Sequence, residues 1–203
     1  SSSPMPPATA PADAAPRHDA RVSPLERRLL GMLLFTLLTT LGALVANPLP
    51  PDGVPMTLQT LAVILAALCL GPRVGAASMI LYILVGMIGA GVFADGSAGL
   101  AVLAGQTGGY LVGFVLCQPV ITSIIRRRDG AMRGWGAMIL AVLAGHLVIF
   151  ALGVPWLALV RGYSLARALE GGFYPFLLPM LLKCAIAVII GRWAAPWAMR
   201  RIW

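Results

Sequence analysis

Apolar residues fill most of this chain in long blocks, and short polar, glycine-rich or proline-rich segments separate the blocks. A helix rises about 1.5 Å per residue, so roughly 20 apolar residues cross the hydrocarbon core of a bilayer. The pattern therefore predicts an all-α integral membrane protein with six transmembrane helices. The predicted spans are 25–46, 57–70, 76–90, 107–125, 135–152 and 173–190.

The segments between these blocks predict a cavity. NPLPPDGVPM, residues 47–56, carries four prolines and cannot be helical. The span after it, 57–70, is short for a bilayer, and short spans beside irregular backbone are tolerated where they line a cavity. Residues 92–106, VFADGSAGLAVLAGQ, are rich in glycine, which allows backbone to approach a ligand closely. Residues 153–172 predict a short interfacial helix before the last span.

Composition and charge agree with a membrane protein. Hydrophobic residues make up 59% of the 203 residues and charged residues only 11%, which is unlike a soluble globular domain. The net charge of +8 comes from arginines in the loops rather than from one basic face, so it favours membrane topology and no nucleic-acid partner. Residues 1–24, rich in Pro, Ala and Ser, predict a disordered cytoplasmic tail ahead of a single membrane domain over 25–203.

Arginine placement also predicts the orientation. Arginines flank both termini and follow the second and fourth spans, whereas the loops after the first and third spans have none. The positive-inside rule then places both termini in the cytoplasm, with Arg161 and Arg167 as the exception. In this topology the Pro-rich loop, the Gly-rich loop and the start of the last span meet in an outward-facing ligand pocket.

Lys183, the single lysine of the chain, lies inside the last predicted span. A cation there costs about 2.5–3.5 kcal/mol on insertion scales and usually faces a cavity and a partner. No acidic residue lies inside an apolar block, so a ligand carboxylate is one candidate for the missing negative charge. Three alternatives stay open: Lys183 extends to the interface, is neutral, or pairs with a loop acid such as Asp95.

Three long segments resemble the BioY family of biotin transporters, the substrate-binding membrane components of energy-coupling-factor transporters. The most specific motifs are P-x-T-L-Q-T near residue 57 and G-x-T-G-G-Y-L-x-G-F near residue 107. The resembling segments are NPLPPDGVPMTLQTLAVILAALCLGPRVGA, LYILVGMIGAGVFADGSAGLAVLAGQTGGYLVGF and GVPWLALVRGYSLARALEGGFYPFLLPMLLK.

The resemblance implies that biotin is the ligand and that Lys183 binds its carboxylate. Uncharged partners for the ureido group would be Thr57, Gln59, Thr107 and Asn47, and the ring would pack against Tyr82, Phe93 and Tyr110. His146 has either a ligand or proton-coupling role or a hydrogen bond to a neighbouring helix. The family pattern has an aspartate three residues before the lysine, where this chain has Met180.

The resemblance further implies uptake across the plasma membrane without a cofactor, together with an energy-coupling membrane subunit and an ATPase pair. Small residues on the first span, with Thr36 and Thr40 in place of alanines, would form the docking surface for that subunit. Membrane lipid would surround the rest of the protein. The alternatives are a solitary transporter and a membrane enzyme. The sequence has no nucleophile–base pair, metal-ligand cluster or nucleotide motif, which argues against the enzyme.

Overall fold

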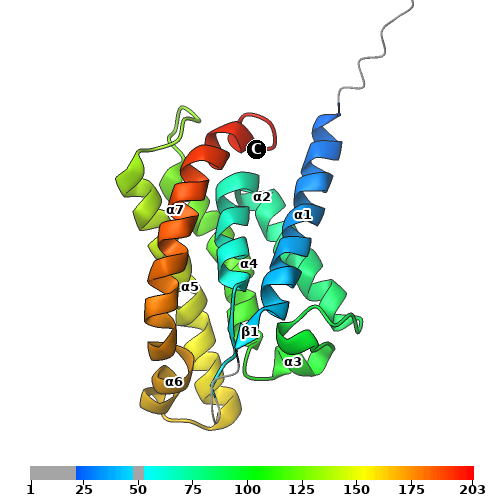
Figure 1. Ribbon diagram of the computed structural model, residues 1–203, viewed down its shortest axis with the longest axis vertical. Helices are drawn as coiled ribbons and strands as arrows, with labels where there is room; N and C mark the ends of the chain where they lie inside the picture. The colour runs from blue at the N-terminus through cyan, green and yellow to red at the C-terminus, as the bar shows by residue number, and fades with distance from the viewer. Residues whose placement is uncertain (1–21, 48–52) are drawn as a thin grey trace, which may run out of the picture.

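The computed structural model describes residues 22–47 and 53–203, and most of the predicted tail, 1–24, lies outside this part. Within it the chain is an elongated bundle of helices (Figure 1). The helices are α1 (Pro24–Leu44), α2 (Gln59–Met87), α3 (Leu100–Ala104), α4 (Gly108–Ile125), α5 (Trp135–Arg161), α6 (Leu165–Gly172) and α7 (Leu177–Met199). Two single-turn helices, η1 (Ala94–Gly96) and η2 (Tyr174–Phe176), and two short strands, β1 (Ala46–Asn47) and β2 (Met56–Thr57), complete the described elements.

Long apolar helices confirm the prediction of a multi-pass, all-α membrane protein. Among the described residues, five segments are long and apolar enough to cross a membrane. They contain α1, α2, α4, α5 and α7, and large leucine and isoleucine side chains are exposed along them. Such side chains on the outside of a bundle are compatible with lipid rather than water.

The second and third predicted spans both lie within the element α2, whose two helical halves, 59–70 and 72–87, are separated by a break at Gly71. Gly71 interrupts α2 with φ 76° and ψ −177°, a conformation that favours glycine. Pro72 follows and lacks the N–H that would continue the helical hydrogen bonds. The predicted turn is therefore present as a sharp kink. The indole of Trp203 donates to the Cys69 carbonyl at 2.9 Å and packs over Gly71.

Small residues of α1 pack within the chain. Gly42 lies so close to the start of α2 that a Cβ there would be 2.9 Å from the Gln59 backbone nitrogen. Thr36 donates to the Ser78 carbonyl at 3.0 Å, and Thr39 is fully buried. Small residues of the first span, expected to dock a coupling subunit, thus contact α2 within the chain at Thr36 and Gly42, and a face of leucines on α1 is exposed.

The segments predicted as irregular are short structured pieces. β1 pairs with β2 in an antiparallel ribbon at the two ends of the Pro-rich loop. The Gly-rich segment forms η1 and α3 instead of one open loop. The predicted end of the fifth span at Leu152 is wrong, because α5 continues through Pro155 to Arg161 and ends at Gly162 with φ 65°. The interfacial helix is α6, Leu165–Gly172.

The two ends of the bundle differ in content. The start of α1, the loop after α4 and the chain's C-terminus lie at one end (Figure 1). β1, α3 and α6 lie at the opposite end, where the candidate site is built. The loop after α4 and the C-terminal residues at the first end carry Arg126, Arg127, Arg128, Arg200 and Arg201.

Candidate functional site

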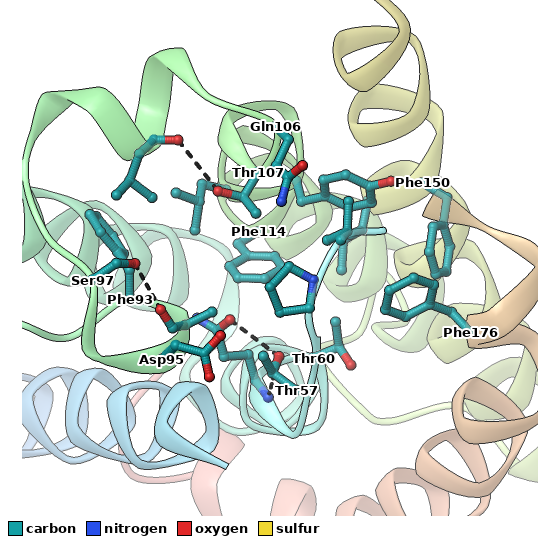
Figure 2. A pocket seen from close by; sticks show the side chains of 18 of the residues that line it. Thr57, Thr60, Phe93, Asp95, Ser97, Gln106, Thr107, Phe114, Phe150 and Phe176 are labelled. Atoms are coloured by element: carbon teal, nitrogen blue, oxygen red, sulfur yellow. Dashed lines mark hydrogen bonds between the residues drawn. The ribbon is translucent and has the colours of Figure 1, made fainter. Parts of the chain in front are cut away.

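A cavity of about 350 Å³ opens between the irregular segments and the helices at the α3–α6 end. Its lining comes from the residues before α2, the first turn of α2, η1, α3, and the facing sides of α4, α5 and α7. Figure 2 shows Thr57, Thr60 and Asp95 on one side, and Phe150 and Phe176 on another. The volume is in the range of small-molecule sites, and the wall is mostly apolar with a few polar groups.

Lys183 lies on the wall of this cavity, in α7, with 7% of its surface exposed. Its Nζ donates to the Thr57 carbonyl at 2.6 Å and to Thr60 Oγ1 at 3.1 Å. No carboxylate in the described part of the chain lies within 4.0 Å of this nitrogen. An ammonium group has three donors, so one remains for a further acceptor. Lys183 therefore neither extends into lipid nor forms an internal ion pair with a described acid.

Hydrogen bonds fix the polar wall beside Lys183. Thr57 Oγ1 donates to Gln59 Oε1 at 3.2 Å, and Gln59 Nε2 donates to the Tyr82 hydroxyl at 2.5 Å. Tyr82 in turn donates to the Val92 carbonyl at 2.9 Å. The Tyr82 ring meets Phe93 edge-on, with centroids 5.5 Å apart. The start of α2 is thus connected to the end of α2 and the Gly-rich segment through side chains that line the cavity.

Aromatic side chains build the opposite wall. Phe150 contacts Tyr110 and Phe176, with ring centroids 6.2 Å and 5.9 Å away, respectively. The Tyr110 hydroxyl donates to the Gly172 carbonyl at 2.9 Å. Gly153 packs directly against the Tyr110 ring, and a Cβ at this position would overlap it. The position of the Tyr110 ring therefore requires glycine at residue 153 of α5.

Thr107 precedes α4 and contacts the Gly-rich segment instead of capping the helix. Its Oγ1 donates to the Val102 carbonyl at 3.4 Å, and its backbone is already helical with φ −98° and ψ −9°. Gln106 is its neighbour on the cavity wall, and Figure 2 shows the two together. Trp156 fixes the same turn by donating to the Gly105 carbonyl at 2.9 Å.

His146 is 1% exposed and lies on the cavity wall in α5. Its Nδ1 is 3.0 Å from the Val142 carbonyl and 3.5 Å from the Cys184 sulfur. A carbonyl only accepts, so Nδ1 carries the proton. Nε2 is buried and has no hydrogen-bond partner among the described residues. The bond to Val142 is within α5, and the Cys184 sulfur of α7 is a second, longer contact of the same Nδ1.

Eight of the nine residues singled out from the sequence line this cavity. They are Thr57, Gln59, Tyr82, Phe93, Thr107, Tyr110, His146 and Lys183. Asn47 is the exception: it is exposed in β1, paired with Met56, and is not part of the lining.

Sequence reasoning missed lining residues that helical spacing could have indicated. Phe176, the N-cap residue of α7, precedes Met180 and Lys183 at helical intervals of four and three residues, and all three line the cavity. Thr60, in the first turn of α2, also accepts a hydrogen bond from Lys183. Asp95, the alternative partner considered for the lysine, forms no ion pair with it. It lies on the lining with φ 57°, and its carboxylate has no described partner.

The profile of the BioY family matches residues 16–200. The chain belongs to the BioY family. A relative from Pyrococcus horikoshii, named a probable biotin transporter, is 41% identical over 77% of this chain and 89% of its own length. The biotin transporter of Thermotoga maritima is 36% identical over 81% of this chain and 93% of its own.

A solved structure supports the fold of this BioY-family chain. The biotin S component of an ECF-type ABC transporter superposes with a TM-score of 0.74, over 82% of this chain and 89% of that one. Its sequence identity is 24%, so the likeness concerns the fold. The relatives are named as transporters and not as enzymes, which agrees with the expectation that the chain is not an enzyme.

Proposed function

We propose that this chain binds biotin within the plasma membrane and mediates its uptake, as the substrate-binding component of an energy-coupling-factor transporter. The single observation that carries the proposal is Lys183. It is a buried cation on a cavity wall whose described partners, Thr57 and Thr60, are both uncharged. A carboxylate that entered the cavity would supply the missing negative charge, and such charge-assisted bonds are stronger than neutral ones. The names of the relatives point to the same ligand.

Biotin matches the other groups of the cavity. Its ureido group has both donors and acceptors, and Thr57, Gln59 and Thr107 offer uncharged groups of both kinds. Its ring and hydrocarbon chain are apolar, and Tyr82, Phe93 and Tyr110 supply apolar surface. His146 lines the same cavity, and its Nε2 is buried without a hydrogen-bond partner among the described residues. We assign these seven residues and Lys183 to the ligand.

Met180 distinguishes this cavity from the family pattern with an aspartate at that position. Met180 lies on the lining one turn before Lys183. A thioether cannot compete with a ligand for the ammonium group, so Lys183 retains its free donor. Asp95 is the acidic residue among the described lining residues, and it is on the Gly-rich segment. We therefore expect the ligand carboxylate to depend on Lys183 more than in a cavity where the aspartate is present.

Partner subunits are part of the proposal, and an exposed surface is available for them. Leu30, Leu33, Leu37 and Leu41 of α1 are at least half exposed. A coupling membrane subunit would contact this leucine face, because the small residues are already used against α2. A solitary transporter is the second candidate, and it would leave the face to lipid.

Binding of labelled biotin to the purified protein tests the proposal. We expect saturable binding that unlabelled biotin competes and biotin methyl ester competes at least tenfold less well, since the ester lacks the charge. Absence of saturable binding would reject the proposed ligand. Equal competition by the ester would reject the role of Lys183 while leaving biotin in place. Uptake by cells with and without the coupling and ATPase subunits separates partnered from solitary transport.

A further inference from the structure

An open hollow lies at the other end of the molecule, between the end of α4 and the start of α5. It is lined by Arg127, Arg128, Met132, Arg133, Gly134 and Ala137. None of these residues contributes to the biotin cavity. Three arginines line this one hollow, and each guanidinium is able to bind two oxygens of an oxyanion side by side.

The backbone of this loop is ordered by its own hydrogen bonds. Arg126 and Met132 form an antiparallel bridge, and the Arg133 amide donates to the Ile125 carbonyl at 2.8 Å. The Arg127 amide donates to the Ala131 carbonyl, also at 2.8 Å. The turn closes at Gly130 with φ 82°. The arginines are thus presented from a small hairpin rather than from an extended loop.

The positive charge of the hollow exceeds its negative charge. The carboxylate of Asp129 lies 3.4 Å from Arg127 Nε and also accepts from the Ala131 amide. Arg133 uses one nitrogen, Nε, on the Arg126 carbonyl at 3.4 Å. Arg128 forms no hydrogen bond or ion pair with any residue that the structure describes. Arg128 and Arg133 therefore keep donors for an anion.

The start of α5 adds to the same field. Its N-cap is Gly134, which has no side chain to cap the first turn. The unpaired amides and the helix dipole there favour an anion, and both Gly134 and Ala137 line the hollow. A Cβ at Gly134 would meet nothing within 4 Å, so the approach from outside is open.

Neighbouring residues place the hollow at the level of lipid head groups. Trp135, half exposed, lies under the guanidinium of Arg192 at 5.5 Å from its ring centroid. Arg126 and Arg201 stack on Trp203 and Trp197 at the same end of the molecule. Tryptophan and arginine together are typical of the membrane interface. We infer that the hollow binds a phosphate group, and that an anionic phospholipid of the surrounding leaflet supplies it.

The test measures which phospholipid the full-length protein retains. Wild-type protein is reconstituted in nanodiscs of phosphatidylcholine with a minor fraction of phosphatidylglycerol, and the lipid retained after delipidation is counted by native mass spectrometry. We expect at least a tenfold preference for phosphatidylglycerol over phosphatidylcholine in the retained lipid. Arg128→Gln with Arg133→Gln should remove at least nine-tenths of that preference, and Arg128→Gln alone should weaken it. Arg73→Gln removes an exposed charge outside the hollow and should change it less than twofold.

Two controls keep the outcomes distinct. Biotin binding by the double variant should stay within twofold of wild type, which verifies its fold without relying on the hollow. Inorganic phosphate at millimolar concentration, in detergent without phospholipid, should raise the melting temperature less than phosphatidylglycerol does. An equal rise would overturn the lipid source in favour of a free anion. An unchanged lipid preference in the double variant would overturn the lipid site. If the same variant lost biotin uptake while its lipid preference stayed unchanged, the arginines would instead bind a protein partner, and the lipid site would again be overturned.

Discussion

The two ends of the molecule contain the same kind of charge in opposite settings. At the cavity end, Lys183 is buried and contacts only neutral groups among the described residues. At the other end, arginines are exposed and lie on tryptophan rings or backbone carbonyls. A buried cation strongly favours an incoming anion, whereas an exposed one interacts with solvent and head groups at little cost. The two ends therefore differ in the burial of their positive charges and not in the sign of those charges.

The largest expected effect is on biotin affinity, when one positive charge of α7 is removed at the buried end and one at the exposed end. Lys183→Gln should weaken biotin binding roughly 100-fold, since losing one partner of a buried charge pair costs about 2–5 kcal/mol. Arg192→Gln, the same change near the other end, should alter it less than about threefold. Isothermal titration on both variants measures this. Comparable losses of biotin affinity in the two variants would show that the burial of Lys183 has no special role. Melting temperatures of both variants distinguish that result from misfolding.

Adding one methyl group at each end tests packing. Gly153→Ala places a Cβ in the Tyr110 ring, so we expect a loss of about 1–3 kcal/mol in the free energy of unfolding. Gly136→Ala, in α5 near the arginine end, meets nothing within 4 Å and should be neutral or stabilising by up to about 1 kcal/mol. Thermal unfolding in detergent checks both. Similar effects of the two changes would contradict the packing of the aromatic wall.

A single hydroxyl group tests the polar wall. Tyr82→Phe leaves the Gln59 amide and the Val92 carbonyl without their shared partner, which we expect to cost about 1–2 kcal/mol in the free energy of unfolding. Biotin affinity should fall several-fold because Gln59 loses its orientation. Tyr174→Phe, at an exposed position of η2, is the matched control and should change neither quantity. Unchanged stability of Tyr82→Phe would show that the hydrogen bonds of Tyr82 to Gln59 and Val92 do not stabilise the fold.

Backbone strain gives the smallest effect. Asp95 has φ 57°, so Asp95→Gly should stabilise the protein by about 0.5–1 kcal/mol. Gly130 has φ 82° at the arginine end, so Gly130→Ala should destabilise it by a similar amount. Opposite shifts in melting temperature are the expected result. Biotin affinity measured on Asp95→Gly shows in addition whether its carboxylate affects the ligand.

Local signals in the sequence were enough to locate most of the helices and much of the site. Apolar blocks determined the spans, because backbone groups in lipid must be satisfied by helices. Prolines and glycines indicated the segments that line the cavity, and the absence of an acidic residue from the apolar blocks drew attention to Lys183. Family motifs then indicated Gln59, Thr107 and their neighbours, which the structure brings to one wall.

Tertiary packing decided the rest. A positive φ at Gly71 breaks α2 at the predicted turn, whereas α5 continues through Pro155, because neighbouring helices compensate such an interruption in a membrane protein. Asn47 and Thr57 are both close to the Pro-rich loop in sequence, yet the β1–β2 ribbon leaves the first exposed and places the second at the cavity. The sequence by itself determined that a cation lies in an apolar helix. Only the fold decided that its neighbours are the carbonyl of Thr57 and the hydroxyl of Thr60, since contacts between residues more than a hundred positions apart depend on how the helices pack.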